Sequence, residues 1–139
     1  MEATATKSFA AKHRFARITA RKARRVAAII RGKSVNEALE VLQFTPQRGA
    51  PFYLRLLKSA VANAAQDEEV NVNHLVITEV KADDGPLVQG RMRFRPGPQG
   101  RVRPWHKRTS HLTIRVEVAE MLAAPKSKSK SKSKSSKEL

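Results

Sequence analysis

The sequence predicts an α+β domain in which three helices pack on a small three-stranded antiparallel sheet, with a long protruding β-hairpin. Residues 112–118 alternate apolar and polar side chains as a strand does, while apolar residues recur at three- and four-residue spacing through residues 19–31 and 52–65. The turn-forming segment 96–100 lies between two arms in which Arg alternates with apolar residues, a pattern typical of a hairpin.

One domain with two tails is the expected organisation. The 139 residues suffice for a single domain, which we expect to span residues 7–121 and to include an extended hairpin at residues 83–111. Residues 1–6 are expected to be disordered. Residues 122–139 form a Lys/Ser tail, also expected to be disordered because its repeat at 126–137 has no apolar residue to bury. This tail either binds phosphates without specificity or only adds solubility.

The N-terminal half predicts a strand and two helices. Residues 7–18 read as a short edge strand that leads into the first helix, which Thr19 caps and Gly32 ends. Ser34 and Glu37 have the spacing of a capping box, in which each side chain bonds a free amide at the helix start. The second helix is expected to be short and to end by Phe44.

A third helix and two strands complete the predicted body. Thr45 and Pro46 have the favoured order of cap and first residue for the third helix, although Gly49 and Pro51 predict an irregular opening. An acidic loop at 67–73 precedes a strand at 75–82, which we expect to pair antiparallel with residues 112–118. The predicted core consists of Val26, Ile30, Leu39, Leu42, Leu56, Leu57, Val61, Ile77, Ile114 and Val116.

The predicted hairpin is a polycation. No Asp or Glu lies between Asp84 and Glu117. About 16 residues per arm at roughly 3.3 Å each extend on the order of 50 Å, and a two-stranded ribbon with few apolar residues is at best marginally stable in water. The hairpin should therefore need a large polyanion around it. Its cations are Arg91, Arg93, Arg95, Arg101, Arg103, Lys107 and Arg108.

The overall charge favours nucleic acid as the partner. Lys and Arg number 28 against 12 Asp and Glu, for a formal charge of +16 and a pI near 11.2. Ten cations and no acid lie between residues 3 and 36, whereas residues 37–84 carry eight acids. No apolar run approaches the roughly 18 residues of a membrane span, so no membrane partner is expected, and the lack of Cys fits a reducing compartment. Aromatic residues make up 5%, too few for base stacking to be the main binding mode.

Enzymatic readings find no support in the sequence. The four His residues are scattered and show no metal-ligand spacing, and Ser110 and His111 lie on opposite faces of one strand. Asp83 and Asp84 precede Gly85 and fit a turn. We therefore expect no catalytic residue, no metal and no cofactor. Two alternatives stay open for other residues: the first-helix cations either bind a polyanion or form a solvated face, and Trp105 either links the hairpin arms or stacks on a base.

Five motifs, in order, resemble bacterial large-subunit ribosomal protein twenty-two. They are Ala11-Lys12-His13-Arg14-Phe15-Ala16-Arg17; Arg21-Lys22-Ala23-Arg24 through Ile30-Arg31-Gly32-Lys33; Leu57-Lys58-Ser59-Ala60-Val61-Ala62-Asn63-Ala64; Asp84-Gly85-Pro86; and Gly100-Arg101 with Lys107-Arg108-Thr109-Ser110-His111. The resemblance implies a structural protein that binds 23S rRNA, supports subunit assembly and lines the nascent-peptide exit tunnel with its hairpin tip. Implied partners are 23S rRNA, neighbouring large-subunit proteins including ribosomal protein four, and the nascent peptide, with one monomer per ribosome in the cytoplasm.

The same resemblance implies the site residues. The implied rRNA-binding set is Lys12, His13, Arg14, Arg17, Arg21, Lys22, Arg24, Arg25, Arg31, Lys33, Arg91, Arg93, Arg95, Arg101, Arg103, Lys107, Arg108, Thr109, Ser110 and His111. The implied tunnel-lining tip is Arg95, Pro96, Gly97, Pro98, Gln99, Gly100, Arg101 and Val102.

This chain departs from the family pattern in the hairpin. Its tip has Pro96-Gly97-Pro98 where the family usually has Pro-Arg-Ala, and its first arm around residues 89–94 is slightly longer. Pro104 and Trp105 replace a more ordinary strand pair. The runner-up function, from net charge and the Lys/Ser tail, is a nucleoid-type protein that binds DNA without sequence specificity.

Overall fold

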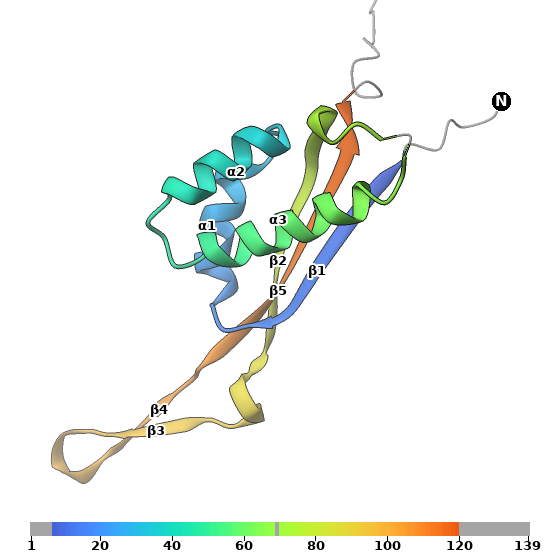
Figure 1. Ribbon diagram of the computed structural model, residues 1–139. Helices are drawn as coiled ribbons and strands as arrows, with labels where there is room; N and C mark the ends of the chain where they lie inside the picture. Colours follow the sequence, from blue (N-terminus) through green and yellow to red (C-terminus); the bar gives the residue numbers. More distant parts are fainter. Residues whose placement is uncertain (1–6, 69, 120–139) are drawn as a thin grey trace, which may run out of the picture.

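The computed structural model describes residues 7–68 and 70–119, and the predicted tails at 1–6 and 122–139 lie outside this range. Helices α1 (Ala20–Ile30), α2 (Val35–Phe44) and α3 (Ala50–Ala64) cover one face of a three-stranded sheet, from which a long hairpin extends (Figure 1). This arrangement confirms the predicted α+β class.

The sheet is antiparallel with strand order β1-β5-β2. Strand β1 (Ser8–Ala16) is the predicted edge strand, and β5 (Arg108–Val118) lies between it and β2 (Leu75–Leu87). The inward-facing residues of these strands alternate with polar ones, as residues 112–118 predicted: Leu112, Ile114 and Val116 are all at most 1% exposed. The central strand is thus the one whose pattern was clearest in the sequence.

Helix α1 begins and ends where the sequence predicted. The carbonyl oxygen of Thr19 accepts hydrogen bonds from the N–H groups of Lys22 and Ala23, at 3.0 and 3.1 Å. Gly32, at φ +75°, adopts the left-handed conformation that ends helices and that glycine tolerates without a Cβ clash. The buried face is Ala20, Ala23, Val26, Ala27 and Ile30, so the basic residues project from the opposite face.

Helix α2 forms half of the predicted capping box. The Ser34 hydroxyl accepts a hydrogen bond from the Glu37 N–H at 3.3 Å. The Glu37 carboxylate pairs with the Lys33 ammonium group instead of reaching back to the Ser34 amide. The helix ends at Phe44, as predicted.

The predicted start of the third helix was wrong. Helix α3 begins at Ala50, with Gly49 as its N-cap and Pro51 in its first turn, where a missing N–H costs nothing. The Thr45 hydroxyl instead donates back to the Val41 carbonyl at 2.6 Å and so closes α2. Gly49 packs tightly, since a Cβ there would lie 2.9 Å from Cγ2 of Val26.

The core lies between the helices and the sheet, and its largest fully buried side chain is Tyr53. Eight of the ten predicted core residues are buried. Leu39 and Val61 are only partly buried, although both pack against the core. The apolar spacing therefore predicted the buried face of the helices correctly, except for two residues that lie at the edge of that face.

The structure confirms the predicted long hairpin, which consists of two ladders joined by a kink that was not predicted. The proximal ladder pairs β2 with β5 as far as Leu87 and Arg108, and the distal ladder pairs β3 (Arg93–Pro96) with β4 (Val102–Trp105). Between the ladders the first arm has five residues (88–92) and the second has two (106–107). A short 3₁₀ turn, Val88–Gly90, takes up the extra residues, and the distal hairpin bends away there (Figure 1).

The tip lies where the sequence predicted. Pro96 pairs with Val102, so residues 97–101 form the turn. The Gly97 N–H donates to the Arg101 carbonyl oxygen at 2.6 Å, and Gly100 has φ +71°. A Cβ at Gly97 would lie 2.8 Å from that same carbonyl oxygen, so this closely approached position needs glycine.

Candidate nucleic-acid interface

The distal hairpin is basic and has no interior. No residue from 88 to 108, a fully described range, is buried. Arg91, Arg95, Arg101 and Arg103 are exposed. These cations are predicted rRNA-binding residues, and all of them project from a ribbon that has two solvated faces.

Trp105 links the two arms of the distal hairpin. The guanidinium carbon of Arg95 lies 4.4 Å from the centre of the Trp105 ring, and that of Arg93 lies 5.9 Å away. Such cation–π contacts contribute about 0.5–1 kcal/mol at exposed sites. Of the two alternatives for Trp105, the geometry therefore supports the link between the hairpin arms over stacking on a base, because arginine side chains already contact its ring.

A cluster of cations forms where the second arm meets the helical body. Three segments far apart in the chain line one hollow of about 430 Å³: the junction of β1 and α1, the loop between α2 and α3, and residues 105–108. All of its Lys and Arg side chains converge without a carboxylate among the lining residues. We call this set the cation cluster: Arg17, Lys22, Arg48, Lys107 and Arg108.

Arg48 was not among the predicted site residues. It lies in the mildly acidic middle of the sequence, where nothing near it in the chain marks a binding surface. The fold brings Arg48 close to Lys22, and the two residues line two neighbouring hollows together. One is the hollow of the cation cluster, and the other also contains Arg25. Its position depends on tertiary packing of the α2–α3 loop, so local sequence patterns could not have found it.

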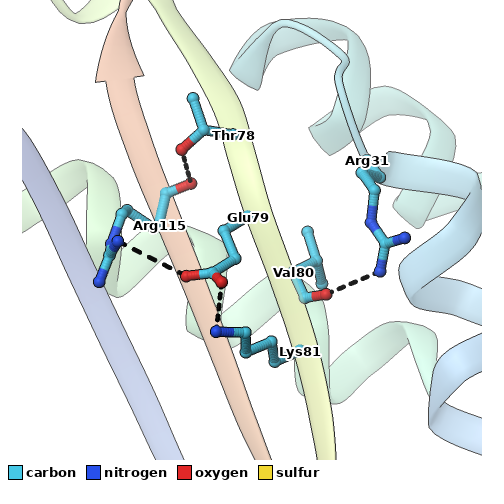
Figure 2. Close-up of polar contacts among 6 residues, drawn as sticks. All are labelled: Arg31, Thr78, Glu79, Val80, Lys81 and Arg115. Atoms are coloured by element: carbon cyan, nitrogen blue, oxygen red, sulfur yellow. Dashed lines mark hydrogen bonds and ion pairs between the residues drawn. The ribbon is translucent and has the colours of Figure 1, made fainter.

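Part of the basic face of α1 is engaged within the protein. The Arg31 guanidinium donates to the Val80 carbonyl oxygen at 3.0 Å (Figure 2). The Arg24 guanidinium donates to the Ala82 carbonyl oxygen at 3.1 Å and lies 3.5 Å from the Asp84 carboxylate. These two side chains join α1 to β2. The exposed cations elsewhere on this face are Arg21, Lys22 and Arg25.

On the open face of the sheet, one carboxylate lies between two cations. The Glu79 carboxylate pairs with the Lys81 ammonium group and lies 3.6 Å from the Arg115 guanidinium on the neighbouring strand (Figure 2). The hydrogen bond from Lys81 lowers the pKa of Glu79, with the Arg115 charge acting in the same direction. The Thr78 hydroxyl donates to the Arg115 carbonyl oxygen at 3.4 Å (Figure 2). This surface differs from the acid-free hairpin because its two cations share a carboxylate partner within the protein.

The predicted residues on β1 lie at the edge of the sheet. Lys12, His13 and Arg14 are exposed, and the His13 ring lies 6.0 Å from the Phe52 ring of α3. His111 is half-buried, and its ring meets the Phe15 ring edge-on at 4.9 Å. Lys33, the last of the N-terminal set, is paired with Glu37.

Thr109 and Ser110 lie inside the protein, at the base of the hairpin. They are 5% and 0% exposed. The Thr109 hydroxyl donates to the Pro86 carbonyl oxygen at 2.6 Å, and a Cβ at Gly85 would lie 2.6 Å from that hydroxyl. We therefore assign both side chains to the packing of the hairpin base, which also accounts for the Gly85-Pro86 motif.

Other kinds of site find no support in the part of the chain that the structure describes. Within residues 7–68 and 70–119 no three His, Asp or Glu side chains gather as metal ligands. In the same residues no helix is long and apolar enough to cross a membrane.

The fold and these surfaces define a class of protein: a helical body with a thin, acid-free projection and a convergent cluster of cations, suited to lie against a polyanion. Residues 11–117 match the family model described as ribosomal protein L22p/L17e, and the chain belongs to this family. The resemblance inferred from the five motifs is thereby confirmed.

Two relatives have the same name and cover most of the chain. The large ribosomal subunit protein uL22 of Latilactobacillus sakei is 44% identical over 104 residues, which are 75% of this chain and 86% of the relative. The large ribosomal subunit protein uL22 of Caldicellulosiruptor saccharolyticus is 47% identical over 111 residues, which are 80% of this chain and 88% of the relative. Both names denote ribosomal proteins of the large subunit rather than enzymes.

Proposed function

We propose that this chain is a structural constituent of the large ribosomal subunit that binds 23S rRNA, supports subunit assembly and lines the nascent-peptide exit tunnel with its hairpin tip. Its partners are 23S rRNA, neighbouring proteins including ribosomal protein four, and the nascent peptide. One copy resides in each ribosome, in the cytoplasm. Membership of the family gives the starting point, and the shape and charge of the hairpin support the finer assignment.

The observation that supports this function best is the acid-free hairpin without an interior. Between residues 88 and 108 no side chain is buried, so apolar burial contributes little to holding the ribbon. Arginine forks bind phosphate in bidentate fashion, and duplex RNA is recognised by shape, phosphate and 2′-hydroxyl contacts rather than by base edges. Folded RNA that encloses the hairpin supplies both the countercharge and the missing contacts.

The proposed contacts fall into two groups. The hairpin arms bind phosphates through Arg91, Arg93, Arg103, Lys107 and Arg108, and the cation cluster adds Arg48 where the arm meets the body. The exposed α1 and β1 cations extend this surface along the body. Thr109 and Ser110 are left out because their side chains are buried. At the tip, Gln99 at φ +58° and Gly100 at φ +71° hold a narrow turn.

Co-sedimentation and proteolysis test the rRNA-binding role. The tagged chain should sediment with large subunits at a fixed stoichiometry, and protease should cut residues 91–103 in the free protein but not in the subunit. Equal cleavage in both states would contradict the proposal. Competition separates the runner-up function, since duplex DNA that displaced 23S rRNA at moderate salt would favour a nucleoid protein.

A single-cysteine variant tests the tunnel-lining role. The chain has no Cys, so Gln99→Cys introduces one thiol at the tip, and Lys58→Cys on α3 is the matched control. In ribosomes with stalled nascent chains, a thiol crosslinker should join the peptide to the tip variant and not to the control. Equal crosslinking of the two variants, or none at the tip, would exclude the tip from the tunnel wall.

A further inference from the structure

Phe15 has a backbone conformation that aromatic residues rarely adopt. Its φ is +58°, in the left-handed region where residues with a Cβ are uncommon and where strain costs about 1–3 kcal/mol. The pairing of β1 with β5 shifts register between His13 and Ala16, which places one extra residue in β1. Bulges of this kind redirect a side chain, and they are frequent next to functional sites.

His111 holds this conformation from the neighbouring strand. The Phe15 N–H donates to Nδ1 of His111 at 3.2 Å. The two rings meet edge-on, with centres 4.9 Å apart and planes 80° apart. The main chain and the ring of Phe15 are therefore both fixed by one side chain, so the strained conformation is well determined.

The result of this strain is an exposed aromatic ring. Phe15 is 57% exposed, although a strand residue directed to the core would have gained roughly 1.5–3 kcal/mol by full burial. Folding alone gives no reason for a bulge that turns a phenylalanine away from the core. Strain that positions an exposed side chain suggests that a ligand contacts it.

The ring stands between two hollows of the surface. One, of about 360 Å³, is lined by Lys12, Arg14, Phe15, His111, Leu112 and Thr113. The other, of about 450 Å³, is lined by Phe15, Arg17, Thr109 and residues 86–90, which cover the end of β2 and the start of the kink. No carboxylate is among the residues that line either hollow, so a ligand on either side of the ring meets only cationic charge.

We propose that Phe15 is a stacking platform for an unpaired nucleobase of RNA, whose flanking phosphates bind Lys12 and Arg14 on one side of the ring and Arg17 on the other. Every nucleobase has a flat face that stacks on an aromatic ring, and unpaired bases are the ones that RNA-binding proteins stack in this way. This inference rests on the proposed rRNA-binding function and adds to it one site that does not depend on charge alone.

Three substitutions separate the ring from the strained backbone. Phe15→Tyr keeps the aromatic face, and Phe15→Leu keeps an apolar side chain and the strain but removes that face. Phe15→Gly removes the ring and relieves the strain, so its melting temperature should equal or exceed that of the wild type. A loss of RNA affinity by the glycine variant could then not be attributed to misfolding.

Binding of the full-length variants to 23S rRNA over a range of salt concentrations tests the stacking. Phe15→Leu and Phe15→Gly should weaken binding roughly 5- to 150-fold at every salt concentration, and Phe15→Tyr should bind as the wild type does. The slope of log K against log salt should stay unchanged in all three, because no cation is lost. Arg14→Gln is the matched control and should lower the magnitude of the slope by about 1.

The outcomes distinguish this inference from the function on which it rests. Leu and Gly variants that bind as tightly as the wild type would overturn the stacking platform alone, as would a change in slope equal to that of Arg14→Gln. A wild-type chain without preference for 23S rRNA over duplex DNA would overturn both proposals. Acylation of RNA 2′-hydroxyls should also show an unpaired nucleotide whose reactivity differs between wild type and Phe15→Leu, and identical profiles would count against stacking.

Discussion

The helical body and the distal hairpin are folded by different forces. In the body, the faces of three helices and a sheet enclose a continuous apolar core centred on residues such as Tyr53, Leu57 and Ile114, all 0% exposed. In the hairpin, residues 88–108 have no buried member, and the charged side chains are all cations. Apolar burial can hold the body together in water, whereas it contributes little to the hairpin, which has no buried residue between 88 and 108.

The two regions meet at a packed joint. Gly85 and Thr109 touch at the base of the hairpin, the Thr109 hydroxyl bonds Pro86, and Arg24 reaches from α1 to Asp84. Beyond this joint the ladder ends at Leu87 and Arg108, and the kink begins. The kink therefore separates a hairpin base that is packed against the body from a distal ladder that pairs only with itself.

Deletion of residues 91–103 should have the largest effect on rRNA binding and almost no effect on the stability of the body. The variant loses five arginines, so its affinity for 23S rRNA should fall on the order of 10²-fold or more, and the salt slope should shrink by about four. Its melting temperature without RNA should change by no more than about 2 °C, because no core residue is removed. Salt-dependent binding and calorimetry measure the two quantities. A large loss of melting temperature would show that the hairpin supports the body after all.

Charge reversal in the cation cluster should have the next largest effect. Arg48→Glu should lower rRNA affinity roughly tenfold and the salt slope by about one, if the cluster binds phosphate. Lys58→Glu makes the same change in net charge at an exposed position of α3 and serves as the control. Comparable losses in the two variants would mean that total charge matters and the cluster does not.

Two glycine substitutions compare the joint directly with the tip. A Cβ at Gly85 would lie 2.6 Å from the Thr109 hydroxyl and 3.2 Å from its carbonyl group, whereas one at Gly97 would lie 2.8 Å from the Arg101 carbonyl oxygen. Gly85→Ala should destabilise the free protein by about 1–3 kcal/mol. Gly97→Ala should leave the free energy of unfolding unchanged within about 0.5 kcal/mol, because local opening of the tip is independent of the body. Denaturant titrations of both variants measure these values, and equal losses would contradict the division into two regions.

The sequence predicted those features that depend on local patterns. Alternation at residues 112–118, three-four spacing in the helices and the turn residues at 96–100 act over a few residues each, and the fold class, the helix faces and the tip followed from them. The cap at Ser34 and the stop at Gly32 were likewise visible, since capping is a local interaction.

The missed features depend on contacts between distant segments. The start of α3 is at Ala50 because Gly49 packs against Val26 and Pro51 fits the first turn, a choice that Thr45 and Pro46 alone could not reveal. Arg48 joins the cation cluster only through tertiary packing. The only sign of the kink in the sequence was the slightly longer first arm of the hairpin. Nothing in the sequence indicated the positive φ of Phe15, which a hydrogen bond to His111 on the neighbouring strand maintains.

The smallest predicted effect concerns Tyr53 and tests whether water reaches its hydroxyl in the interior of the body. Burial raises the pKa of Tyr53 to about 12, and its hydroxyl has no hydrogen-bond partner among the described residues. Because the unfolded chain releases this proton near pH 10 while the native chain keeps it, the free energy of unfolding falls as the pH rises above 10. The loss reaches about 1 kcal/mol by pH 11. Tyr53→Phe should match the wild type at pH 7 within about 1 kcal/mol and should lack this part of the alkaline loss, as denaturant titrations at each pH would show.

Comparison of the wild type with Tyr53→Phe isolates the tyrosine, because every other ionisable side chain is the same in both proteins. A difference that opens between pH 10 and 11 would mean that the ionised phenolate is excluded from a closed apolar interior. Parallel pH profiles would mean that water or a rearranged side chain reaches the hydroxyl. In that case solvent would reach part of the core of the body. The difference between a body that is held by apolar burial and a hairpin that is not would then be smaller than the exposed fractions indicate.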